Sequence, residues 1–582
     1  MFLWFQPRLS QAGSSMFEGL IENEGVSPET SDLWCTYAAI RSLSWLNKLD
    51  LISDSEVIAH YLKLRQNSDG GFGWMHGMPS DAWATYYCTQ ALRDLGHLPG
   101  RDLSSVENWT TGCQNDDGGF GMQPGQDSDI WATYFCVRTL VELSNKQPHL
   151  SIIGYLETLQ GSDGSLSWTP GDNDGDVRAC YYGAVAATHV SGENPNWNKG
   201  SLIRWLRQSQ QKDGGFTFKT GDTTSCMWAT FRATAALRIL GSHPENPNAC
   251  IEWVISQQLH DDAFVRWPDY PIADVWAQFC AVGTLLQLDY PIERLADGIA
   301  SRIMSFRIPG AGFTYREPES AADVLSTSAA VIMGSGSGDQ VGKWISWLKN
   351  CILPNENGIM YMPGRGSEIR STLWALCAGN MFSDSSTSKL VTSWLRGVQI
   401  RGSAFGYWEG RGADIVSTSA AVEILDAFGE QLEPLGKMWV LKFVERCRMG
   451  SSSYANVPGG FPTLRASLQA IRIRYLLNKD NTVGNVEEVL ECFRVPGGGY
   501  ANSGNRFPDL LSTYEAVRAI DETRLHLDEQ HISRFLASID HGTRSYGWTP
   551  MSPSGGSLAA TLGYLLQQRI ETGKPLLPLI LS

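Results

Sequence analysis

The sequence predicts an all-α protein built as two α/α (α6–α6) barrels from twelve helical-hairpin repeats. Three observations predict this fold: a period of roughly 45 to 50 residues, apolar runs without a polar face, and amphipathic segments between those runs. A fixed period of this length is typical of stacked helical hairpins. A helix that is apolar all round is buried, whereas an amphipathic helix keeps one face in water. The alternation therefore predicts inner helices surrounded by outer helices.

The repeat unit is clearest in residues 66–95. A polar glycine turn (QNSDGGFG, 66–73) precedes Asp81, and an apolar run begins at Trp83. The next copy has the turn QNDDGGFG (114–121), Asp129 and a run from Trp131. We call the position of Asp81 the marker position. It is occupied along the chain by Asp32, Asp81, Asp129, Asp176, Cys226, Asp274, Asp323, Glu368, Asp414, Thr463, Asp509 and Ser557.

An Asp directly before a helix suits the N-cap, because it accepts hydrogen bonds from the first free backbone N–H groups. It also faces the positive end of the helix dipole. We therefore expect capping to be the ordinary role of the marker residues. A small hydroxyl follows most markers by four residues: Thr36, Thr85, Thr133, Thr230, Thr327, Thr372, Thr418, Ser467, Thr513 and Thr561. Amphipathic outer helices are predicted between the inner runs, for example at 56–65, 201–208, 343–349 and 487–494.

Twelve inner helices form either one long solenoid or two closed rings of six, and closure removes the exposed ends that a solenoid must cap. The residue two positions after the marker changes near the middle of the chain. It is Trp in five of the first six repeats: Trp34, Trp83, Trp131, Trp228 and Trp276. In the last six repeats it is Leu325, Arg370, Val416, Arg465, Leu511 and Ala559. We therefore predict a first barrel over residues 1–295 and a second over 296–582, with differently lined centres.

The composition excludes several classes of protein. The formal net charge of −15 disfavours a nucleic-acid surface. No apolar run reaches transmembrane length, and the start of the chain lacks the basic flank and cleavage site of a signal peptide. Twelve Cys without a CxxC pair indicate a reducing compartment. We expect a cytoplasmic protein, with peripheral membrane contact as an open alternative. For the short apolar tail 576–581, packing is the favoured role.

The glycine turns at 66–73, 114–121, 160–164 and 211–216 resemble the QW-type turns of the terpene cyclase and protein prenyltransferase superfamily. The run DGDVRACY (174–181) is similar to the stretch that opens inner helices in prenyltransferase β subunits. The resemblance covers roughly residues 25 to 570. Two barrels in one chain resemble the class II terpene cyclases, that is, squalene–hopene cyclases and bacterial class II diterpene cyclases.

This resemblance implies an isomerase of isoprenoid biosynthesis that cyclises a polyprenyl substrate, expected to be a diphosphate, after protonating a double bond. The family acid is the middle Asp of a D-x-D-D motif at the first inner helix of the second barrel. That position here is Asp323, and its neighbours are Ala322 and Val324. Asp129 (with Asp127) and Asp176 (with Asp174) are further acid candidates, because paired carboxylates can raise one pKa. These pairs suit Mg²⁺ as well.

Candidate substrate-binding residues are two arginines and four aromatic residues: Arg370, Arg178, Trp374, Trp131, Tyr134 and Trp276. A buried arginine must be paired, with a marker carboxylate or with a substrate diphosphate. We expect internal pairing for Arg178 and a ligand contact for Arg370. The aromatic residues either fill the barrel core or stabilise a carbocation through their ring faces.

For cofactors, we expect Mg²⁺ at most. Zinc is not expected, because no Cys lies two residues after a marker, where prenyltransferases have a ligand. The chain also lacks the Walker A and Rossmann glycine motifs of nucleotide binding. Two alternatives to the cyclase remain: a non-catalytic isoprenoid- or peptide-binding scaffold, and a carbohydrate-active α/α-barrel enzyme. The last would need two carboxylates across an open cleft.

Overall fold

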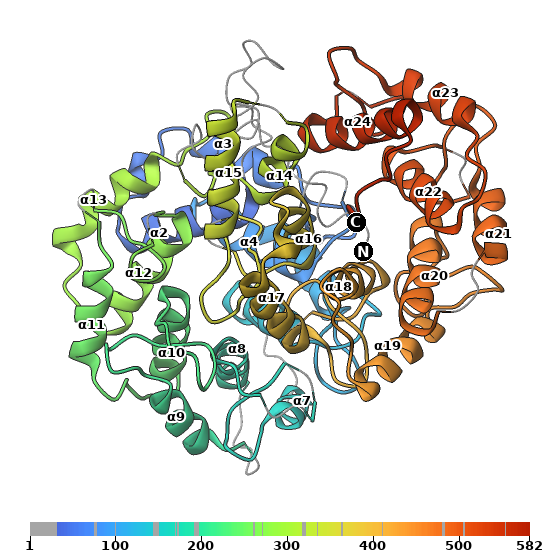
Figure 1. The fold of residues 1–582 in the computed structure, drawn as a ribbon. Coiled ribbons are helices and arrows are strands. Elements are labelled where there is room, and N and C mark those ends of the chain that lie inside the picture. Colours follow the sequence, from blue (N-terminus) through green and yellow to red (C-terminus); the bar gives the residue numbers. More distant parts are fainter. Residues whose placement is uncertain are drawn as a thin grey trace. The chain divides into compact units, whose positions relative to one another are not determined.

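The structure, a computed structural model, describes residues 32–581 except 75–77, 99, 144–150, 169, 172–173, 191–196, 260–261, 271, 317–321, 335, 363–364, 410, 480–482, 505–506 and 553. The described residues form helices, turns and isolated β-bridges (Figure 1). The predicted all-α class is therefore confirmed. The chain divides into two compact units, one running to Ala321 and the other from Ala322 to Ser582. No described helix is both long enough and apolar enough to span a bilayer.

The first unit is a closed ring of helical hairpins. Its inner helices are α2 (Leu33–Trp45), α4 (Ala82–Asp94), α6 (Ile130–Arg138), α8 (Val177–Thr188), α10 (Met227–Ile239) and α12 (Val275–Gln287). Each contacts the next in this order, and α12 returns to α2. The outer helices are α3 (Ser55–Lys63), α5 (Gly100–Thr111), α7 (Ser151–Leu159), α9 (Lys199–Gln208), α11 (Pro247–Ser256) and α13 (Glu293–Met304). Two short pieces, η2 (Leu49–Leu51) and the π-helical η3 (Thr139–Leu143), follow α2 and α6.

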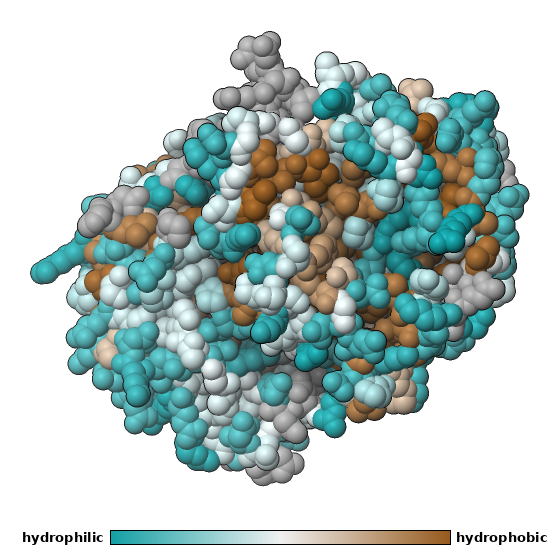
Figure 2. Space-filling model, in the orientation of Figure 1, coloured by the Kyte–Doolittle hydropathy of each residue, from teal (hydrophilic) through white to brown (hydrophobic). Residues whose placement is uncertain are grey.

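The second unit repeats this plan. Its inner helices are α14 (Val324–Ile332), α16 (Ile369–Ala378), α18 (Ile415–Ala427), α20 (Leu464–Asn478), α22 (Leu510–Thr523) and α24 (Gly556–Thr572), and α24 contacts α14. The outer helices are α15 (Gly338–Asn350), α17 (Ser385–Val398), α19 (Pro434–Arg446), α21 (Val483–Phe493) and α23 (Glu529–Ile539), with a 3₁₀ turn η5 (Met381–Ser383). Figure 2 shows apolar side chains gathered over α14 and α16, as expected for inner helices that are apolar on most sides.

The first ring closes through the turn that follows α13. The Asp32 N–H donates to the Phe313 carbonyl at 2.8 Å, and the Phe313 N–H donates to Thr36 Oγ1 at 2.9 Å. Arg307 in the same turn forms an ion pair with Asp54 at 2.8 Å. Helix α13 and its turn thus belong to the first ring. The division between the units accordingly lies after residue 321 rather than at the expected residue 295.

The marker residues occupy the N-caps of eleven of the twelve inner helices. Asp81, for example, accepts hydrogen bonds from the N–H groups of Trp83 and Ala84, both at 3.0 Å. Cys226 makes no side-chain cap bond. The last marker differs, since Ser557 lies inside α24, whose N-cap is Gly555. Capping is therefore the general role of this position, as the sequence predicts.

In eight repeats of the described chain, the hydroxyl four residues after the marker joins a glycine turn to an inner helix. It accepts the backbone N–H of the aromatic or aliphatic residue in the turn, at 2.9 to 3.2 Å. The pairs are Phe313–Thr36, Phe72–Thr85, Phe120–Thr133, Phe216–Thr230, Ile359–Thr372, Phe405–Thr418, Tyr454–Ser467 and Tyr500–Thr513. The turn itself needs glycine: Gly70 has φ +96°, and a Cβ there would collide with the carbonyl of Ser105 on α5. The turn therefore joins three helices at one point.

Replacing Thr36 by Val is expected to destabilise the first unit by about 1–3 kcal/mol, because the buried Phe313 N–H loses its acceptor at the point of ring closure. Thr111→Val is the control, since Thr111 is exposed and bonds only within its own helix. Urea unfolding followed by circular dichroism measures the difference. Equal midpoints for the two variants would contradict this role of the hydroxyl.

Candidate functional site

The first barrel encloses a cavity of about 350 Å³. Side chains from all six inner helices line it: Tyr37, Arg41, Trp45, Tyr87, Tyr134, Phe135, Arg138, Tyr181, Tyr182, Phe231, Arg232, Ala235, Trp276, Phe279, Gly283, Leu286 and Gln287. These residues lie from two to thirteen positions after their markers, and most lie five or more positions after. The cavity therefore occupies the half of the barrel toward the carboxyl ends of the inner helices.

A layer of tryptophans closes the barrel axis below the cavity. The Trp34 ring lies 5.5 Å from Trp83, 5.8 Å from Trp228 and 5.1 Å from Trp276, measured between ring centroids. Trp83 continues the layer to Trp131 at 4.9 Å. Trp34 and Trp228 stand on α2 and α10, which are not neighbours in the ring, so the layer reaches across the barrel axis. Trp276 is the only one of these five rings that lines the cavity.

A second aromatic layer lies five residues after the markers and consists of Tyr37, Tyr86, Tyr134, Tyr181, Phe231 and Phe279. All of these rings except Tyr86 line the cavity. The hydroxyl groups of Tyr134 and Tyr181 lie 3.0 Å apart, within hydrogen-bonding distance. Burial raises the pKa of Tyr37 to about 12, so this phenol stays neutral at physiological pH. Burial likewise raises the pKa of Tyr86 and Tyr134 well above the ordinary value. The aromatic part of the wall is therefore uncharged, and the charges in the cavity come from Arg41, Arg138 and Arg232.

Two arginines at the ninth position after their markers carry compensated charges. Arg41 forms an ion pair with Asp94 at 2.8 Å and stacks over the Trp45 ring. Arg138 forms an ion pair with Glu142 at 2.6 Å and donates to the Tyr134 hydroxyl at 2.6 Å. Burial alone would raise the pKa of Glu142, but the Arg138 guanidinium holds it well below its usual range. Glu142 therefore remains charged at neutral pH, whereas burial raises the pKa of Asp94 above its ordinary value.

Arg232 on α10 is different from the other two. It is 8% exposed, lines the cavity, donates to the Trp228 carbonyl at 3.2 Å and lies over the Trp228 ring. No carboxylate of the described chain forms an ion pair with it, and its Nε has no hydrogen-bond acceptor there. A buried charge is costly unless it is paired. The cavity therefore presents a cation that an anionic group could neutralise.

Two of the predicted substrate-binding residues, Tyr134 and Trp276, line this cavity, whereas Trp131 belongs to the tryptophan layer. Arg178 lies in an internal pair, with Nη2 2.6 Å from Asp176 and its guanidinium over the Phe218 ring. Burial would raise the pKa of Asp176, but the Arg178 charge lowers it below the ordinary value. Asp176 is therefore an anion and unsuited to donating a proton.

The other first-barrel candidate, Asp129, is a partly exposed cap that accepts the Ala132 N–H at 2.8 Å. Its neighbour Asp127 is exposed, and neither residue lines the cavity. Within the described chain, no three His, Cys, Asp or Glu side chains converge as a metal site would require. Mg²⁺ is commonly held by one or two carboxylates together with waters and substrate phosphates, so its binding at the Asp127/Asp129 or Asp174/Asp176 pair stays a prediction.

In the second barrel, Asp323 is 3% exposed and caps α14. It accepts the Ser326 N–H and the Ser326 hydroxyl, each at 2.8 Å. Arg370 is 1% exposed and pairs with Glu368 at 3.0 Å, with its guanidinium over the Tyr407 ring. Asp176 and Arg178 in the first barrel form the same kind of pair, two residues apart. The expected diphosphate contact of Arg370 stays a prediction.

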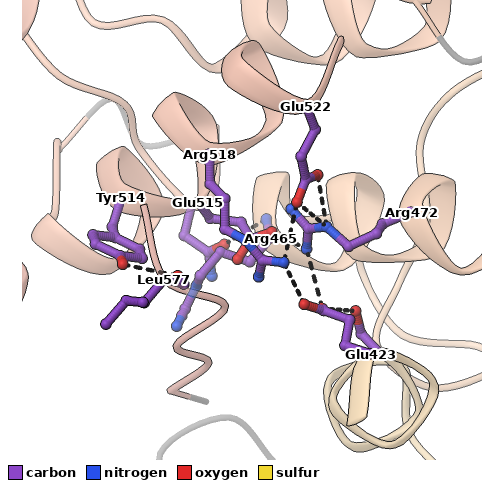
Figure 3. A network of polar contacts seen from close by, with 10 residues as sticks. Glu423, Arg465, Arg472, Tyr514, Glu515, Arg518, Glu522 and Leu577 are labelled. Atoms are coloured by element: carbon purple, nitrogen blue, oxygen red, sulfur yellow. Dashed lines mark hydrogen bonds and ion pairs between the residues drawn. The ribbon is translucent and has the colours of Figure 1, made fainter. Parts of the chain in front are cut away.

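Trp374 does not face a free pocket, because its indole N–H donates to the Ile580 carbonyl at 3.2 Å. A separate cavity of about 520 Å³ lies toward the carboxyl ends of α18, α20 and α22. Arg472 and Arg518 line it among Glu423 and Glu522, with Arg518 Nη2 3.0 Å from Glu522 (Figure 3). Arg472 also pairs with Glu515 behind the cavity wall. This charged cluster is largely self-neutralised, unlike Arg232.

Sequence reasoning did not single out Arg41, Arg138 and Arg232. Arg41 and Arg138 share one repeat phase, nine residues after Asp32 and Asp129, and counting along the repeat would have paired them. Arg232 interrupts an otherwise apolar run, which is the signal of a buried charge. The Oδ2 atom of the marker Asp274 accepts no hydrogen bond in the described chain.

The family model described as "Prenyltransferase alpha-alpha toroid domain" matches residues 11–82, 75–265, 270–390 and 345–498. A search of curated proteins returns no significant match. Solved structures with a similar fold include three isoprenoid enzymes. The type II terpene cyclase MstE from Scytonema is 15% identical, with a TM-score of 0.34, covering 50% of this chain and 98% of its own.

The ent-copalyl diphosphate synthase from Streptomyces platensis is 13% identical, with a TM-score of 0.39, covering 98% of this chain and 100% of its own. Candida albicans protein geranylgeranyltransferase-I, complexed with GGPP, is 14% identical, with a TM-score of 0.21, covering 66% of this chain and 93% of its own. These similarities are too distant to assign an activity to this chain.

The two caps Asp274 and Asp176 are expected to respond to pH with opposite signs. Burial raises the pKa of Asp274 to about 6, above the unfolded value of about 3.9. The native state thus loses stability between these values as pH rises. Asp274→Asn keeps a capping side chain and removes this loss, so we expect it to stabilise the protein at pH 7 by about 1–3 kcal/mol.

Asp176→Asn is the matched comparison. The lowered pKa of Asp176 contributes stability above the unfolded pKa, and this contribution disappears as pH falls. Asp176→Asn should therefore destabilise at pH 7, by about 3–5 kcal/mol because the buried Arg178 loses its ion pair with Asp176, and by less near pH 3. Urea titrations from pH 3 to 8 measure both effects. The same sign for both variants at pH 7 would refute these assignments.

Proposed function

The chain belongs to the prenyltransferase α-α toroid family, and on that premise we propose that it is an isoprenoid-processing enzyme. It binds a linear polyprenyl diphosphate in the cavity of the first barrel and cyclises the chain after protonating a double bond. The observation that carries the proposal is Arg232, a buried guanidinium without a carboxylate partner in the described chain, on the wall of an aromatic cavity.

The cavity supports both parts of such a substrate. Its volume of about 350 Å³ falls within the range of roughly 300–1,000 Å³ typical of small-molecule pockets. The tryptophan layer closes one end, so a hydrocarbon chain would lie against ring faces away from water. A diphosphate would take the place of the missing carboxylate at Arg232, because guanidinium groups bind phosphate oxygens strongly.

The aromatic wall also suits the proposed reaction. A carbocation formed along the chain is attracted to the negative face of an aromatic ring, and this attraction is larger where water is excluded. The rings of Tyr37, Phe231 and Phe279 stand on neighbouring helices of the closed ring, with centroids 5.3–6.1 Å apart from their nearest partners in the layer. The neutral phenols stabilise positive charge without quenching it by proton transfer.

Two carboxyl groups are our candidates for the acid. Asp274 caps α12, two residues before Trp276, and its raised pKa of about 6 keeps part of this group protonated near neutrality. Asp274 does not line the cavity itself, so a substrate held in the first barrel would have to reach it past Trp276, the ring of the tryptophan layer that lines the cavity. Asp323 occupies the position that the resemblance to class II cyclases gives to the acid, and the fully buried Val324 and Leu325 follow it. We assign it to a substrate held in the second barrel.

A second candidate function is binding without catalysis. The observation that favours it is that no Asp or Glu is among the side chains lining the first cavity. Such a protein would hold or carry a polyprenyl diphosphate. The same observation disfavours the carbohydrate hypothesis, which needs two carboxylates facing one cleft.

Arg232→Met should weaken binding of farnesyl diphosphate about 10- to 100-fold, the loss expected for a charge-assisted hydrogen bond of about 1.5–3 kcal/mol. Binding of farnesol should be unchanged, because it lacks the diphosphate. Arg238→Met is the control, since Arg238 lies on the same helix but is exposed and paired with Asp289. Isothermal titration calorimetry measures all three proteins. An equal loss for farnesol, or no loss at all, would remove Arg232 from the proposed site.

Turnover separates the enzyme from the binding protein. Purified protein is incubated with farnesyl, geranylgeranyl and squalene-type substrates, with and without Mg²⁺, and products are identified by mass spectrometry. We expect a cyclic isomer that is lost, at least 100-fold, in Asp274→Asn or Asp323→Asn, since a general acid contributes roughly 10²–10⁴-fold. Asp129→Asn is the control. Saturable binding without product would instead establish the binding protein.

A further inference from the structure

The C-terminal residues 577–581, which we call the strap, lie inside the second barrel. Helix α24 ends at Gly573, and residues 573–575 are exposed and non-helical. The chain then turns inward, so that Leu579, Ile580 and Leu581 are 2%, 1% and 4% exposed. In Figure 1 the end of the chain runs from α24 toward α16. The apolar tail therefore packs within the protein's own core.

Three inner helices hold the strap by its backbone. The Tyr514 hydroxyl on α22 donates to the Leu577 carbonyl at 2.9 Å (Figure 3). Trp374 on α16 donates to the Ile580 carbonyl at 3.2 Å, and Arg465 on α20 donates to the Leu581 carbonyl at 3.3 Å. All three bonds go to main-chain oxygens, so the side chains of the strap contribute by filling space.

The side chains of the strap fill a space that exists because the two barrels differ in their central residues. In the first barrel, the positions two and five residues after the marker carry large aromatic rings in eleven of twelve cases, and these rings plug the axis. In the second barrel the same positions are mostly smaller. They carry Leu325, Arg370, Val416, Arg465, Leu511, Ala559, Ser328, Leu373, Ser419, Leu468, Tyr514 and Leu562. Without the strap, these side chains would leave the centre unfilled, because protein interiors pack without large voids.

We propose that the strap is a displaceable plug, and that the centre of the second barrel is a binding site for a linear isoprenoid chain that the strap keeps closed. The strap is the autoinhibitory element, and its release creates a chamber in which leucine is the commonest lining residue, with Arg370, Arg465 and Tyr514 at its edge. The cavity of about 520 Å³ already touches the strap at Pro578 and would become continuous with that chamber. The choice of an isoprenoid ligand rests on the proposed function; the plug itself does not.

The chemistry of the chamber favours a branched hydrocarbon. Leu579, Ile580 and Leu581 present methyl-branched aliphatic groups one after another along an extended backbone, as a polyprenyl chain presents its methyl groups. A ligand must also compensate for the three donors that lose their carbonyl acceptors, because buried unsatisfied donors are costly. Opening is therefore unfavourable in the free protein, and the apparent affinity of the chamber is reduced by the small open fraction.

The hinge is suited to release. Residues 573–575 carry no regular structure and begin at a left-handed Gly573 with φ +70°. The described side chains of Lys574 and Pro575 are exposed, so movement about this point breaks contacts of the strap without breaking α24.

The test compares the full chain with a chain that ends at Gly573, using calorimetric titration with farnesyl diphosphate. We expect one equivalent bound by the full chain, in the first barrel, and two by the truncated chain. The nonapeptide KPLLPLILS added in trans should abolish the additional equivalent, and the same peptide with Asp at the positions of Leu579 and Ile580 should not. Lys574→Ser in the full chain is the control and should leave one equivalent.

The outcomes are distinct for each hypothesis. The full chain could bind no farnesyl diphosphate while the truncated chain binds one equivalent that the peptide displaces. This result would support the plug and contradict binding in the first barrel. A truncated chain with unchanged circular dichroism and no additional equivalent overturns the plug. If truncation unfolds the second barrel, the double variant Leu579→Ser/Ile580→Ser of the full chain is titrated in place of the truncated chain. Failure of that double variant to gain binding, or to be suppressed by the peptide, shows that the strap is only structural.

Discussion

The fold depends on one hydrogen bond that recurs around both rings, between the backbone N–H of a glycine-turn residue and a hydroxyl on the following inner helix. The turn leaves an outer helix, and its N–H would otherwise be buried without an acceptor. The hydroxyl lies one helical turn after the N-cap. The capping Asp and the hydroxyl therefore both hold the glycine turn, from two sides. A buried N–H without a partner is costly, which is why the chain repeats this pair of residues with so little variation.

The two barrels share this frame and differ in what fills the axis. The first uses its own aromatic side chains. On one side of the tryptophan layer lies a cavity with Arg232, which forms no ion pair with a carboxylate of the described chain. The second uses smaller side chains and the end of the chain. In the first barrel the filling side chains belong to the repeats themselves and cannot leave. In the second barrel the strap is connected through residues 573–575 alone. The same architecture can therefore have a permanently filled centre in the first barrel and a reversibly filled centre in the second.

The architecture could be predicted from sequence because the period, the capping residues and the apolar runs repeat many times, and each copy confirms the others. The boundary was harder. Residue 295 follows from counting inner helices, but ring closure uses the turn at Phe313, which pairs with a helix almost three hundred residues earlier. The site was hardest of all. Arg232 occurs once, and a single residue has no repeat to mark it. Arg370 pairs with the glutamate of its own cap, and its expected ligand contact stays a prediction.

Closure of the first ring has a consequence for how that unit can fail. An open array of hairpins can fray from either end, since a terminal repeat has only one neighbour. In the closed ring, the contact between Asp32 and Phe313 makes the first and last hairpins neighbours, so every hairpin has two. Losing any one of them breaks two interfaces at once. The unit therefore has no weak end at which unfolding begins, and the cavity is protected equally from all sides of the ring.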